Sequence, residues 1–541
     1  MRVLGINAVF HDPAAALVVD GRIVAAAEEE RFSRRKHGKA PVAFSTWELP
    51  EQAARWCLEH ASLAPADLDA VAYSYEPGLA PDPGGDLAAG EWEGLRTLYA
   101  RRARLFLRTA LPGLDPACVR HVPHHVAHAA SAYLAAPFER AAVLVLDGRG
   151  ERASHLAGHA VGGGLKVLAS QRLPHSLGLV YEEATAHLGF RRSSDEYKVM
   201  ALASYGRPRF LPALREAIRA TGDGGFTVAP IAWQSLAPPV RDEARDERHA
   251  DLAASVQARL QEVLLDLARW LHGRTGERAL AMAGGVALNC VANSFLAAQG
   301  PFERVWVQPA AGDAGTALGA ALHVAQRLGD PITPMQTVAL GRGWSDDALR
   351  AWLAGAAVPC ERPDDLADAV AEILAGNGVV GWFQGRSEYG PRALGHRSLL
   401  ANAGDPDNVH RLNAIKGRES FRPVAPMVLQ ARAAEVFDGP LPSPYMLFTQ
   451  RVRPAWRARI PAVVHVDGTA RAQTVDPADE PLVARLLAAV ERRTGLPVVV
   501  NTSFNTAGRP MVDDPRDALE CFGAAPITAL AMGPFLVRRP R

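Results

Sequence analysis

The sequence is poor in cysteine. Its five cysteines are spread over 541 residues, no two form a Cys-x-x-Cys pair, and one must remain unpaired in any disulfide scheme: they stand at Cys57, Cys118, Cys290, Cys360 and Cys521. This usage excludes a disulfide framework and a zinc ribbon, and it is typical of a chain kept in a reducing compartment. We therefore expect a cytoplasmic protein.

The chain also lacks an excess of charge and a long apolar run. It has 59 basic and 58 acidic residues, for a net charge of +1. A near-neutral chain has no broad cationic surface for nucleic acid, although a local basic pocket is compatible with it. No apolar run approaches the 18 or more residues of a membrane span, and the start of the sequence does not resemble a signal peptide. We expect neither nucleic acid nor membrane as a partner.

The length of the chain and one break in its pattern indicate two domains. A single hydrophobic core rarely serves more than about 300 residues. A segment bearing Pro and Gly, 329–347, is followed by a new run of helix, glycine stop and strand in DDLADAVAEILAGNGVVGWF. This restart predicts a separate α/β domain. We place the domains at 1–340 and 341–541.

The first domain carries one pattern twice. Val3–Asn7 reads as a buried strand, followed by a polar loop with His11 and Asp12 and by a hairpin around Asp20-Gly21. From Ala142 the order recurs as a strand VLVLD, the polar loop GRGERAS and a hairpin at residues 162–164. Such a repeat predicts the duplicated ribonuclease-H-like fold of actin, sugar kinases and Hsp70. Between about 210 and 275 the pattern turns helical, above all in HADLAASVQARLQEVLLDLARWLH.

Four residues in this domain suit a metal site. His124 and His128 are spaced to share one helix face, and Asp147 ends a strand at a glycine turn. Asp313, between glycines after the strand-like VWVQ, is the candidate fourth ligand. A shell of two imidazoles and two carboxylates suits Fe(II), Mn(II) or Zn(II). The turn Gly284-Gly285 lies between a strand and a helix, where backbone N–H groups can approach a phosphate.

The second domain concentrates cations in turns that also hold Gly, Ser or Asn. Isolated arginines are usually solvated surface residues, but four such segments could together hold a triphosphate and a second anion. The candidates are Arg386, Arg392 and Arg397; Lys416, Arg418 and Arg422; Arg471; and, at a strand end, Ser503 and Asn505.

Taken in order, the motifs resemble one family along essentially the whole chain. They include GINAVFHDPAAAL, EERFSRRKHG, HHVAHAAS, VLDGRGE, DEYKVMALASYG, GGVALNCVAN, GDAGTALGAAL, GRSEYGPRALGHRS, NAIKGRESFRPVAP, HVDGTARAQTV and NTSFNTAGRP. The chain resembles the ATP-dependent O-carbamoyltransferases of antibiotic and nodulation-factor biosynthesis. Asp195 and Ala201 stand where relatives often have Gly, which affects no proposed ligand.

The resemblance implies a first site in the C-terminal domain. That domain is similar to YrdC-like adenylate synthases, whose Lys-x-Arg and Ser-x-Asn motifs match Lys416-Gly-Arg418 and Ser503-Phe-Asn505. It would form carbamoyl adenylate from carbamoyl phosphate and ATP, with Mg(II) accompanying the nucleotide. The residues expected to bind these substrates are Arg386, Arg392, Lys416, Arg418, Arg422, Arg471, Ser503 and Asn505.

The resemblance implies a second site in the N-terminal domain, at the metal, most simply Fe(II). Carbamoyl adenylate would be bound near Gly148, Gly284, Gly285, Asn289 and Gly312, and the carbamoyl group would pass to a hydroxyl of a natural product, expected to be on a sugar. His11 is the candidate general base, with Asp12 as the alternative, and Lys36 the candidate for polarising the carbonyl or binding acceptor. Lys36 lies in a basic run, and such runs are usually solvated.

Other functions and details stay open at this point. Hydrogenase-maturation enzymes combine similar domains but add an acylphosphatase module and Cys-x-x-Cys zinc fingers. A tRNA threonylcarbamoylation-type fusion and a non-catalytic, metal-dependent nucleotide-binding protein are the alternatives. Acidic residues that could meet an aminated sugar, or be structural, are Glu182, Glu183, Asp195 and Glu196. The sequence leaves open whether the protein is a monomer or a homodimer.

Overall fold

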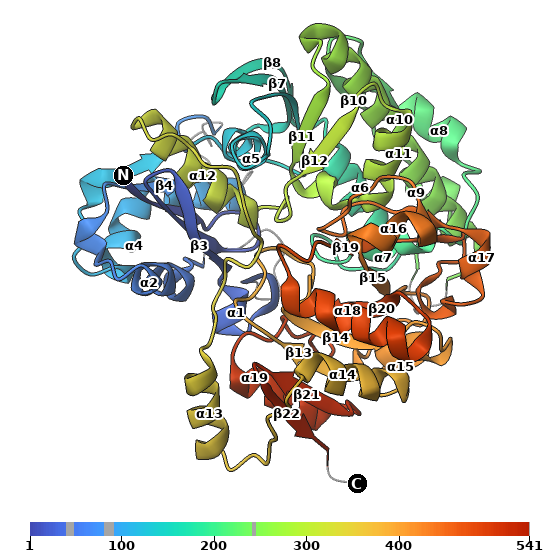
Figure 1. The fold of residues 1–541 in the computed structure, drawn as a ribbon. Helices are drawn as coiled ribbons and strands as arrows, with labels where there is room; N and C mark the ends of the chain where they lie inside the picture. The colour runs from blue at the N-terminus through green and yellow to red at the C-terminus, as the bar shows by residue number, and fades with distance from the viewer. Residues whose placement is uncertain (39–47, 81–90, 241–244, 540–541) are drawn as a thin grey trace. The chain divides into compact units, whose positions relative to one another are not determined.

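A computed structural model of the chain describes residues 1–38, 48–80, 91–240 and 245–539. The chain divides into two compact units, Met1–Gln336 and Thr337–Arg541. Their secondary-structure elements are labelled in Figure 1. Within the described ranges, no helix is both long enough and apolar enough to span a lipid bilayer.

The first unit contains two five-stranded sheets, and the first of them is built from the N-terminal segment. Its order is β3-β2-β1-β4-β5. The strands are β1 (Arg2–Asn7), β2 (Ala14–Val19), β3 (Arg22–Glu28), β4 (Ala70–Tyr73) and β5 (Val119–His121). The hairpin strands β1, β2 and β3 pair antiparallel, whereas β4 and β5 join β1 in parallel. As predicted, the chain reverses at Asp20-Gly21 between β2 and β3.

The second sheet repeats this topology strand for strand. Its order is β12-β11-β6-β7-β8. The strands are β6 (Arg140–Leu146), β7 (Ala153–Val161), β8 (Gly164–Arg172), β11 (Ala279–Ala283) and β12 (Arg304–Val307). Again the first three pair antiparallel and the last two join the central strand in parallel. The predicted duplication of a ribonuclease-H-like half is therefore confirmed.

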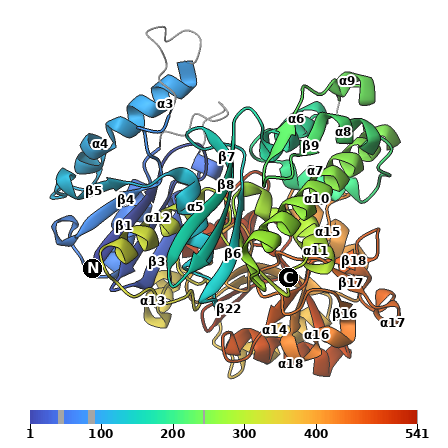
Figure 2. The ribbon, with the colours of Figure 1, turned by 90° about the horizontal axis from the view of Figure 1, so that it is seen from above.

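Helix α5 (His124–Tyr133), which carries His124 and His128, and helix α12 (Ala314–Arg327), which follows Asp313, pack against each other between the two sheets (Figure 2). Helix α5 lies against β6, β7 and β11, and α12 lies against β1, β2 and α5. The close approach depends on small residues in α12. A methyl group at Gly319 would lie only 1.8 Å from the carbonyl oxygen of Ala127 in α5. The run AGTALGAAL thus lets two helix backbones meet.

The remaining α-helices of this unit connect its strands. They are α1 (Glu30–Ser33), α2 (Glu51–His60), α3 (Glu91–Arg101), α4 (Ala103–Ala110), α6 (Leu177–His187), α7 (Glu196–Ala203), α8 (Leu211–Ala217), α9 (Trp233–Leu236), α10 (Glu247–Thr275) and α11 (Cys290–Gln299). The predicted long helix is α10. It begins after Asp246, whose carboxylate accepts the backbone N–H of His249, and ends at Gly276 in the left-handed conformation.

Two local predictions for this unit are wrong. The region 210–275 is not helical throughout, because β9 (Ile218–Ala220) and β10 (Phe226–Val228) form an antiparallel hairpin before α10. The helix expected directly after Gly284-Gly285 starts later. Residues Gly285–Leu288 form a 3-10 turn, and α11 begins at Cys290, where the Asn289 side chain accepts a backbone N–H. The cap formed by the Asn289 side chain therefore sets the residue at which α11 begins, and the preceding turn does not.

The second unit is a mixed α/β structure around a seven-stranded sheet of order β19-β15-β20-β14-β13-β21-β22. These strands are β13 (Val380–Phe383), β14 (Arg397–Asn402), β15 (Ala425–Leu429), β19 (Gln473–Val475), β20 (Val498–Ser503), β21 (Ala529–Met532) and β22 (Phe535–Arg538). A small sheet holds β16 (Phe437–Asp438), β17 (Gln450–Val452) and β18 (Thr469–Ala470). The helices are α13 (Asp346–Gly355), α14 (Leu366–Ala375), α15 (Asp407–Ile415), α16 (Gln430–Val436), α17 (Pro454–Arg457), α18 (Pro481–Thr494) and α19 (Pro515–Ala524).

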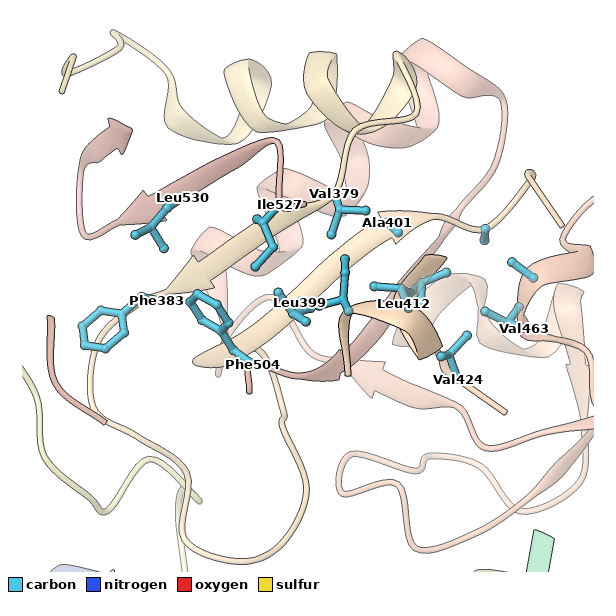
Figure 3. Close-up of a cluster of buried hydrophobic side chains, with 14 of the residues drawn as sticks. Val379, Phe383, Leu399, Ala401, Leu412, Val424, Val463, Phe504, Ile527 and Leu530 are labelled. Carbon is cyan, nitrogen blue, oxygen red and sulfur yellow. The ribbon is translucent and has the colours of Figure 1, made fainter. Parts of the chain in front are cut away.

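The large sheet is buried on both faces, as its continuously apolar strands require. On one face Phe383, Leu399 and Phe504 belong to the cluster drawn in Figure 3. On the other face Trp382 and Leu400, each one residue away along its strand, pack with apolar residues of α14 and α18. The alternation follows from the pleat, which turns successive side chains to opposite faces.

Candidate functional site

The four predicted metal ligands of the first unit lie together. Helix α5 presents His124 and His128 one turn apart, Asp147 follows β6, and Asp313 precedes α12. Each Nε2 atom lies 3.5–3.7 Å from one carboxylate oxygen of Asp147 and one of Asp313. The ligand atoms of all four residues fall within 4.8 Å of one another, and all four residues are buried.

This spacing suits an ion better than it suits hydrogen bonds. Contacts of 3.5 Å or more are too long for strong hydrogen bonds. Two ligands at about 2.1 Å from one tetrahedral ion lie about 3.4 Å apart. Neither imidazole Nε2 has a hydrogen-bond partner among the residues that the structure describes. Buried nitrogens of this kind, facing two carboxylates, form a donor set that fits a divalent transition metal.

A second layer of contacts fixes the imidazoles. The Nδ1–H of His124 points to the carbonyl oxygen of Ser74 at 3.3 Å, which leaves Nε2 free to face the carboxylates. The buried carboxylate of Glu151 accepts the backbone N–H of His124 and that of Glu76, both at 2.8 Å. The Phe10 ring packs edge-on against His124, with centroids 5.1 Å apart. Glu151 was not singled out from the sequence, although it lies within VLDGRGE, four residues after Asp147.

The electrostatics of the cluster favour ion pairs over neutral groups. Burial opposes charge on His124 and His128, but the two neighbouring carboxylates outweigh burial and raise the pKa of both imidazoles. Burial likewise opposes ionisation of Asp147, yet the two imidazoles lower its pKa well below its usual range. The neighbouring His125 is also buried, and burial lowers its pKa to about 3. The cluster thus holds protons that a metal ion would replace.

The predicted glycine turns surround the metal carboxylates. The N–H of Gly285 donates to Asp147 Oδ1 at 2.9 Å, and the N–H of Gly284 donates to the carbonyl oxygen of Ala311. Gly284 has φ +93°, and a side chain there would collide with the backbone of Leu146. Gly148 and Gly312 directly adjoin Asp147 and Asp313. Three glycine-containing loops therefore lie beside the four-residue cluster.

Asn289, predicted to bind the adenylate, has structural contacts. Its side chain caps α11 by accepting the N–H of Ala292 at 2.9 Å. It also exchanges two hydrogen bonds with Gln257 on α10, at 2.8 and 3.1 Å. These bonds tie the loop after β11 to the long helix.

A second group of ionisable side chains lies in the first half of the unit. The Nδ1 atom of His11 lies 2.7 Å from Asp12 Oδ2, and the Nδ1 atom of His37 lies 2.8 Å from Asp12 Oδ1. The other ring nitrogen of His11 contacts the carbonyl oxygen of Ser193. Burial opposes ionisation of Asp12, but the two imidazoles hold its pKa well below its usual range. His37 was not predicted, although it follows Lys36 directly; Lys36 itself is half-buried.

The acidic residues considered for acceptor binding divide into two groups. Glu196 accepts the N–H of Ser193 at 2.6 Å, and Asp195 forms an ion pair with Lys198 at 3.2 Å. Glu183 accepts from the indole of Trp233. These three have structural partners. The Oε1 atom of Glu182 lies near Gly148, where an added methyl group would be 3.3 Å from it, next to the metal cluster.

In the second unit, three of the predicted substrate-binding residues form one cluster. The buried Lys416 ammonium donates to the backbone carbonyl and the hydroxyl oxygen of Ser503, the latter at 2.9 Å, and to the amide oxygen of Asn505. Lys416 follows α15 and Ser503 ends β20. The Lys-x-Arg and Ser-x-Asn motifs are therefore in contact, 87 and 89 residues apart in sequence.

The predicted arginines are held in different ways. Arg418 donates from Nε to the side-chain oxygen of Asn413, and Arg422 lies 3.7 Å from Glu419. Arg386 donates to the backbone carbonyls of residues 340 and 341. Arg392 is half-buried beside the Gly390-Pro391 turn, and the buried Nε of Arg471 has no hydrogen-bond partner in the described parts of the chain.

Arg397 is a structural residue. It is fully buried, lies over the Phe383 ring at 3.8 Å and donates to the carbonyls of Gln384, His396, Arg342 and Gly385. The buried Glu388 carboxylate accepts the N–H groups of Leu394, His396 and Arg397, at 2.7–3.1 Å. The turn GPRALGHRS is therefore fixed from within, and Arg397 does not belong to the candidate anion clamp.

Comparison with known proteins identifies the family. Residues 2–80 and 105–322 match the carbamoyltransferase N-terminus, and residues 371–539 match the carbamoyltransferase C-terminus. The chain belongs to the carbamoyltransferase family. The resemblance predicted from the motifs is confirmed, and the chain is a member of a family of transferases. Neither the tRNA-modifying alternative nor the non-catalytic one is favoured by these matches.

Several relatives are similar over nearly the full chain. The nodulation protein NolNO of Sinorhizobium fredii is 38% identical over 98% of this chain and 80% of its own length. Nodulation protein U of Rhizobium tropici is 33% identical over 96% of this chain and 93% of its own. The protein sll1178 of Synechocystis is 37% identical over 99% of this chain and 96% of its own.

Among solved structures, the likeness is distant. HypF of T. kodakarensis aligns with a TM-score of 0.38 and 15% identity, covering 61% of this chain and 48% of that one. A ROK hexokinase from Thermus thermophilus aligns with a TM-score of 0.32 and 16% identity, over 61% of this chain and 100% of that one. The predicted fold class, a duplicated ribonuclease-H-like domain and a second α/β domain, is confirmed by the strand order itself.

Proposed function

We propose that this chain is an ATP-dependent O-carbamoyltransferase that works in two steps at two sites. The family assignment supports carbamoyl transfer. The observation that carries the two-site proposal is the presence of two separate polar clusters: the His124, His128, Asp147 and Asp313 group in one unit and the Lys416, Ser503 and Asn505 group in the other. One suits a metal and the other suits anions.

The first step is assigned to residues 341–541. Carbamoyl phosphate reacts with water to give carbamate and phosphate; a carbamate oxygen then attacks the α-phosphorus of ATP, and pyrophosphate leaves. The product is carbamoyl adenylate. Mg(II) would accompany ATP. Lys416 and the arginines at 386, 392, 418, 422 and 471 neutralise the phosphate charge, and the Ser503 and Asn505 side chains position it.

The second step is assigned to residues 1–340. Asp12 holds the His11 ring by its Nδ1–H, and the Nε2 atom of His11 leaves the Ser193 carbonyl oxygen to take the proton of the acceptor hydroxyl. The hydroxyl oxygen then attacks the carbamoyl carbon as AMP leaves. The N–H groups of Gly148 and Gly312 suit the adenylate phosphate, beside the turn at Gly284 and Gly285, whose own N–H groups donate to Ala311 and Asp147. A divalent metal held by His124, His128, Asp147 and Asp313, with Fe(II) the first choice, would polarise the carbonyl and neutralise the leaving phosphate.

The acceptor is proposed to be a hydroxylated natural product with the reactive hydroxyl on a sugar. The relatives named as nodulation proteins make this class the first to test. Lys36 and Glu182 are the side chains proposed to meet it, since Lys36 neighbours His37 and Glu182 reaches the loop after β6.

The test separates the two steps. The enzyme is incubated with ATP, carbamoyl phosphate and Fe(II) against a panel of hydroxylated glycosides and macrocycles. Pyrophosphate release reports the first step, and mass spectrometry reports carbamoylation. We expect Lys416→Ala to abolish both signals, and His124→Ala to abolish carbamoylation while retaining pyrophosphate release. Lys166→Ala, at an exposed position on β8, is the control. Loss of pyrophosphate release in His124→Ala would contradict the two-site assignment.

A further inference from the structure

The loops that hold His11 and His37 are strained to bring these residues together. In the first loop Phe10 and Asp12 have φ +67° and +45°, and in the second Arg34 and His37 have φ +57° and +60°. Residues with side chains rarely adopt this left-handed region, and such conformations gather at functional sites. The strained backbone therefore points to a requirement for this arrangement of side chains.

The requirement concerns Asp12. Its Oδ2 faces Nδ1 of His11 at 2.7 Å, and its Oδ1 faces Nδ1 of His37 at 2.8 Å. The Asn7 side chain also fixes the loop, by donating to the carbonyls of His11 and Asp12. Each carboxylate oxygen thus has one imidazole N–H donor, and the charge of Asp12 is shared between two rings.

The distances make this a proton network. Ligands of one tetrahedral ion would lie about 3.4 Å apart, whereas both contacts here have hydrogen-bond length. The three residues are also half-buried rather than fully buried. In both respects the group differs from the cluster at His124.

We propose that His37 is a positioning residue that acts on His11 through Asp12. This inference deepens the proposed function, in which His11 is the general base. The ring N–H of His37 donates to one oxygen of Asp12, so that the other oxygen faces His11 in a fixed direction. This hydrogen bond from the His37 ring also stabilises part of the negative charge of Asp12, which would otherwise act on His11 alone.

Removing the His37 side chain therefore changes how readily His11 takes a proton. The undivided charge of Asp12 favours the imidazolium form of His11, and the His11 titration moves to higher pH. Other charged groups lie around the pair: Glu30, whose carboxylate accepts the backbone N–H of His37; Glu48, paired with Arg35; and, beside Ser193, Glu196. None of these is altered in the variants below.

The experiment uses two substitutions that suit the left-handed backbone of position 37. His37→Gly deletes the side chain without backbone strain, and His37→Asn restores an N–H donor at the position of Nδ1. The full chain is labelled with [15N]histidine, its histidines are titrated by NMR, and the His11 signal is assigned by its loss in His11→Gln. Metal content is measured in each variant to confirm that the site at His124 is intact.

We expect the His11 midpoint to rise by about half a pH unit or more in His37→Gly and to return most of the way in His37→Asn. An unchanged or lowered midpoint in His37→Gly would overturn the proposal, as would an equal shift in both variants. The titration needs no acceptor and no carbamoyl transfer. Its outcome is therefore separate from success or failure of the proposed function.

Discussion

Two loops occupy the same place in the two halves of the duplicated unit, one after β1 and the other after β6. Each brings an aspartate to two imidazoles. After β1, Asp12 lies 2.7 and 2.8 Å from the nitrogens of His11 and His37. After β6, one oxygen of Asp147 lies 3.5 and 3.7 Å from the nitrogens of His124 and His128. The first spacing suits a shared proton and the second a shared ion.

The difference arises from where the imidazoles originate. His124 and His128 belong to one turn of α5, are fully buried, and are fixed by helix geometry before any ligand binds. His11 belongs to a loop and His37 to the short 3-10 turn Lys36–Gly38, and their side chains are about one-fifth exposed. A rigid, buried pair can hold a metal without collapsing onto the carboxylate. A looser pair closes to hydrogen-bond distance.

The largest expected effect comes from exchanging each aspartate for its amide. Asp147→Asn removes a charged ligand, so we expect both bound metal and carbamoyl transfer to fall, the latter about 1000-fold. Asp12→Asn leaves the metal cluster intact but deprives His11 of its carboxylate, and we expect transfer to fall while metal content stays near that of the wild type. Metal analysis and a transfer assay on the same preparations check both results.

The first step provides the internal control for this pair. Pyrophosphate release from ATP should be equal in Asp147→Asn, Asp12→Asn and the unsubstituted chain. If Asp12→Asn lost its metal as Asp147→Asn did, the two loops would not differ in the way that their distances indicate.

Much of the fold followed from local patterns. The repeat of strand, polar loop and hairpin predicted the two matching sheets because period-two alternation and glycine turns act within a few residues. The metal cluster was predictable for a similar reason: HHVAHAAS fixes two imidazoles by helical spacing, and Asp147 and Asp313 each follow a recognisable strand.

Contacts between distant loops were not predictable in this way. His37 reaches Asp12 across 25 residues only because both loops adopt left-handed backbone conformations. Glu151 meets His124 through a backbone N–H, which leaves no mark in a residue pattern. Arg397 was a candidate for the anion clamp because it lies in a segment that also holds Gly and Ser. Its side chain is instead buried among backbone carbonyls, because its position on β14 directs the side chain into the core.

A smaller effect tests the helix pair that supports the metal cluster. Gly319→Ala would place a methyl group 1.8 Å from the Ala127 carbonyl oxygen in α5, and backbone cannot easily move aside. We expect a loss of about 3 kcal/mol in the free energy of unfolding, measured by urea denaturation. Bound metal should fall with it, since α5 carries both imidazoles. We expect the loop after β1 to be less affected. The His11 titration would check this.

A matched substitution separates the clash from the general effect of removing a glycine. Gly273 lies within α10 and has no atom near the site of an added methyl. Because alanine is the better helix former, Gly273→Ala should stabilise the chain by about 0.5–1 kcal/mol. Equal destabilisation by both substitutions would remove the argument for a close α5–α12 contact.

The smallest effect concerns a buried histidine found in one half only. Strand β2 is apolar throughout, whereas β7, its counterpart, holds His155, with both ring nitrogens buried and no hydrogen-bond partner in the described residues. Burial lowers the pKa of His155 to about 4. The unfolded chain therefore takes up this proton first as the pH falls below about 6.5, and the folded unit loses stability between pH 6.5 and 4.

At pH 5 this loss is about 2 kcal/mol relative to pH 6.5, because each pH unit within the window contributes about 1.4 kcal/mol. His155→Met keeps the site apolar and removes the titrating group, so the difference in unfolding free energy between pH 6.5 and pH 5 should shrink by that amount. His60→Gln, at the exposed end of α2, should leave it unchanged. If His155→Met retained the full pH dependence, the buried neutral imidazole would not distinguish the second half from the first.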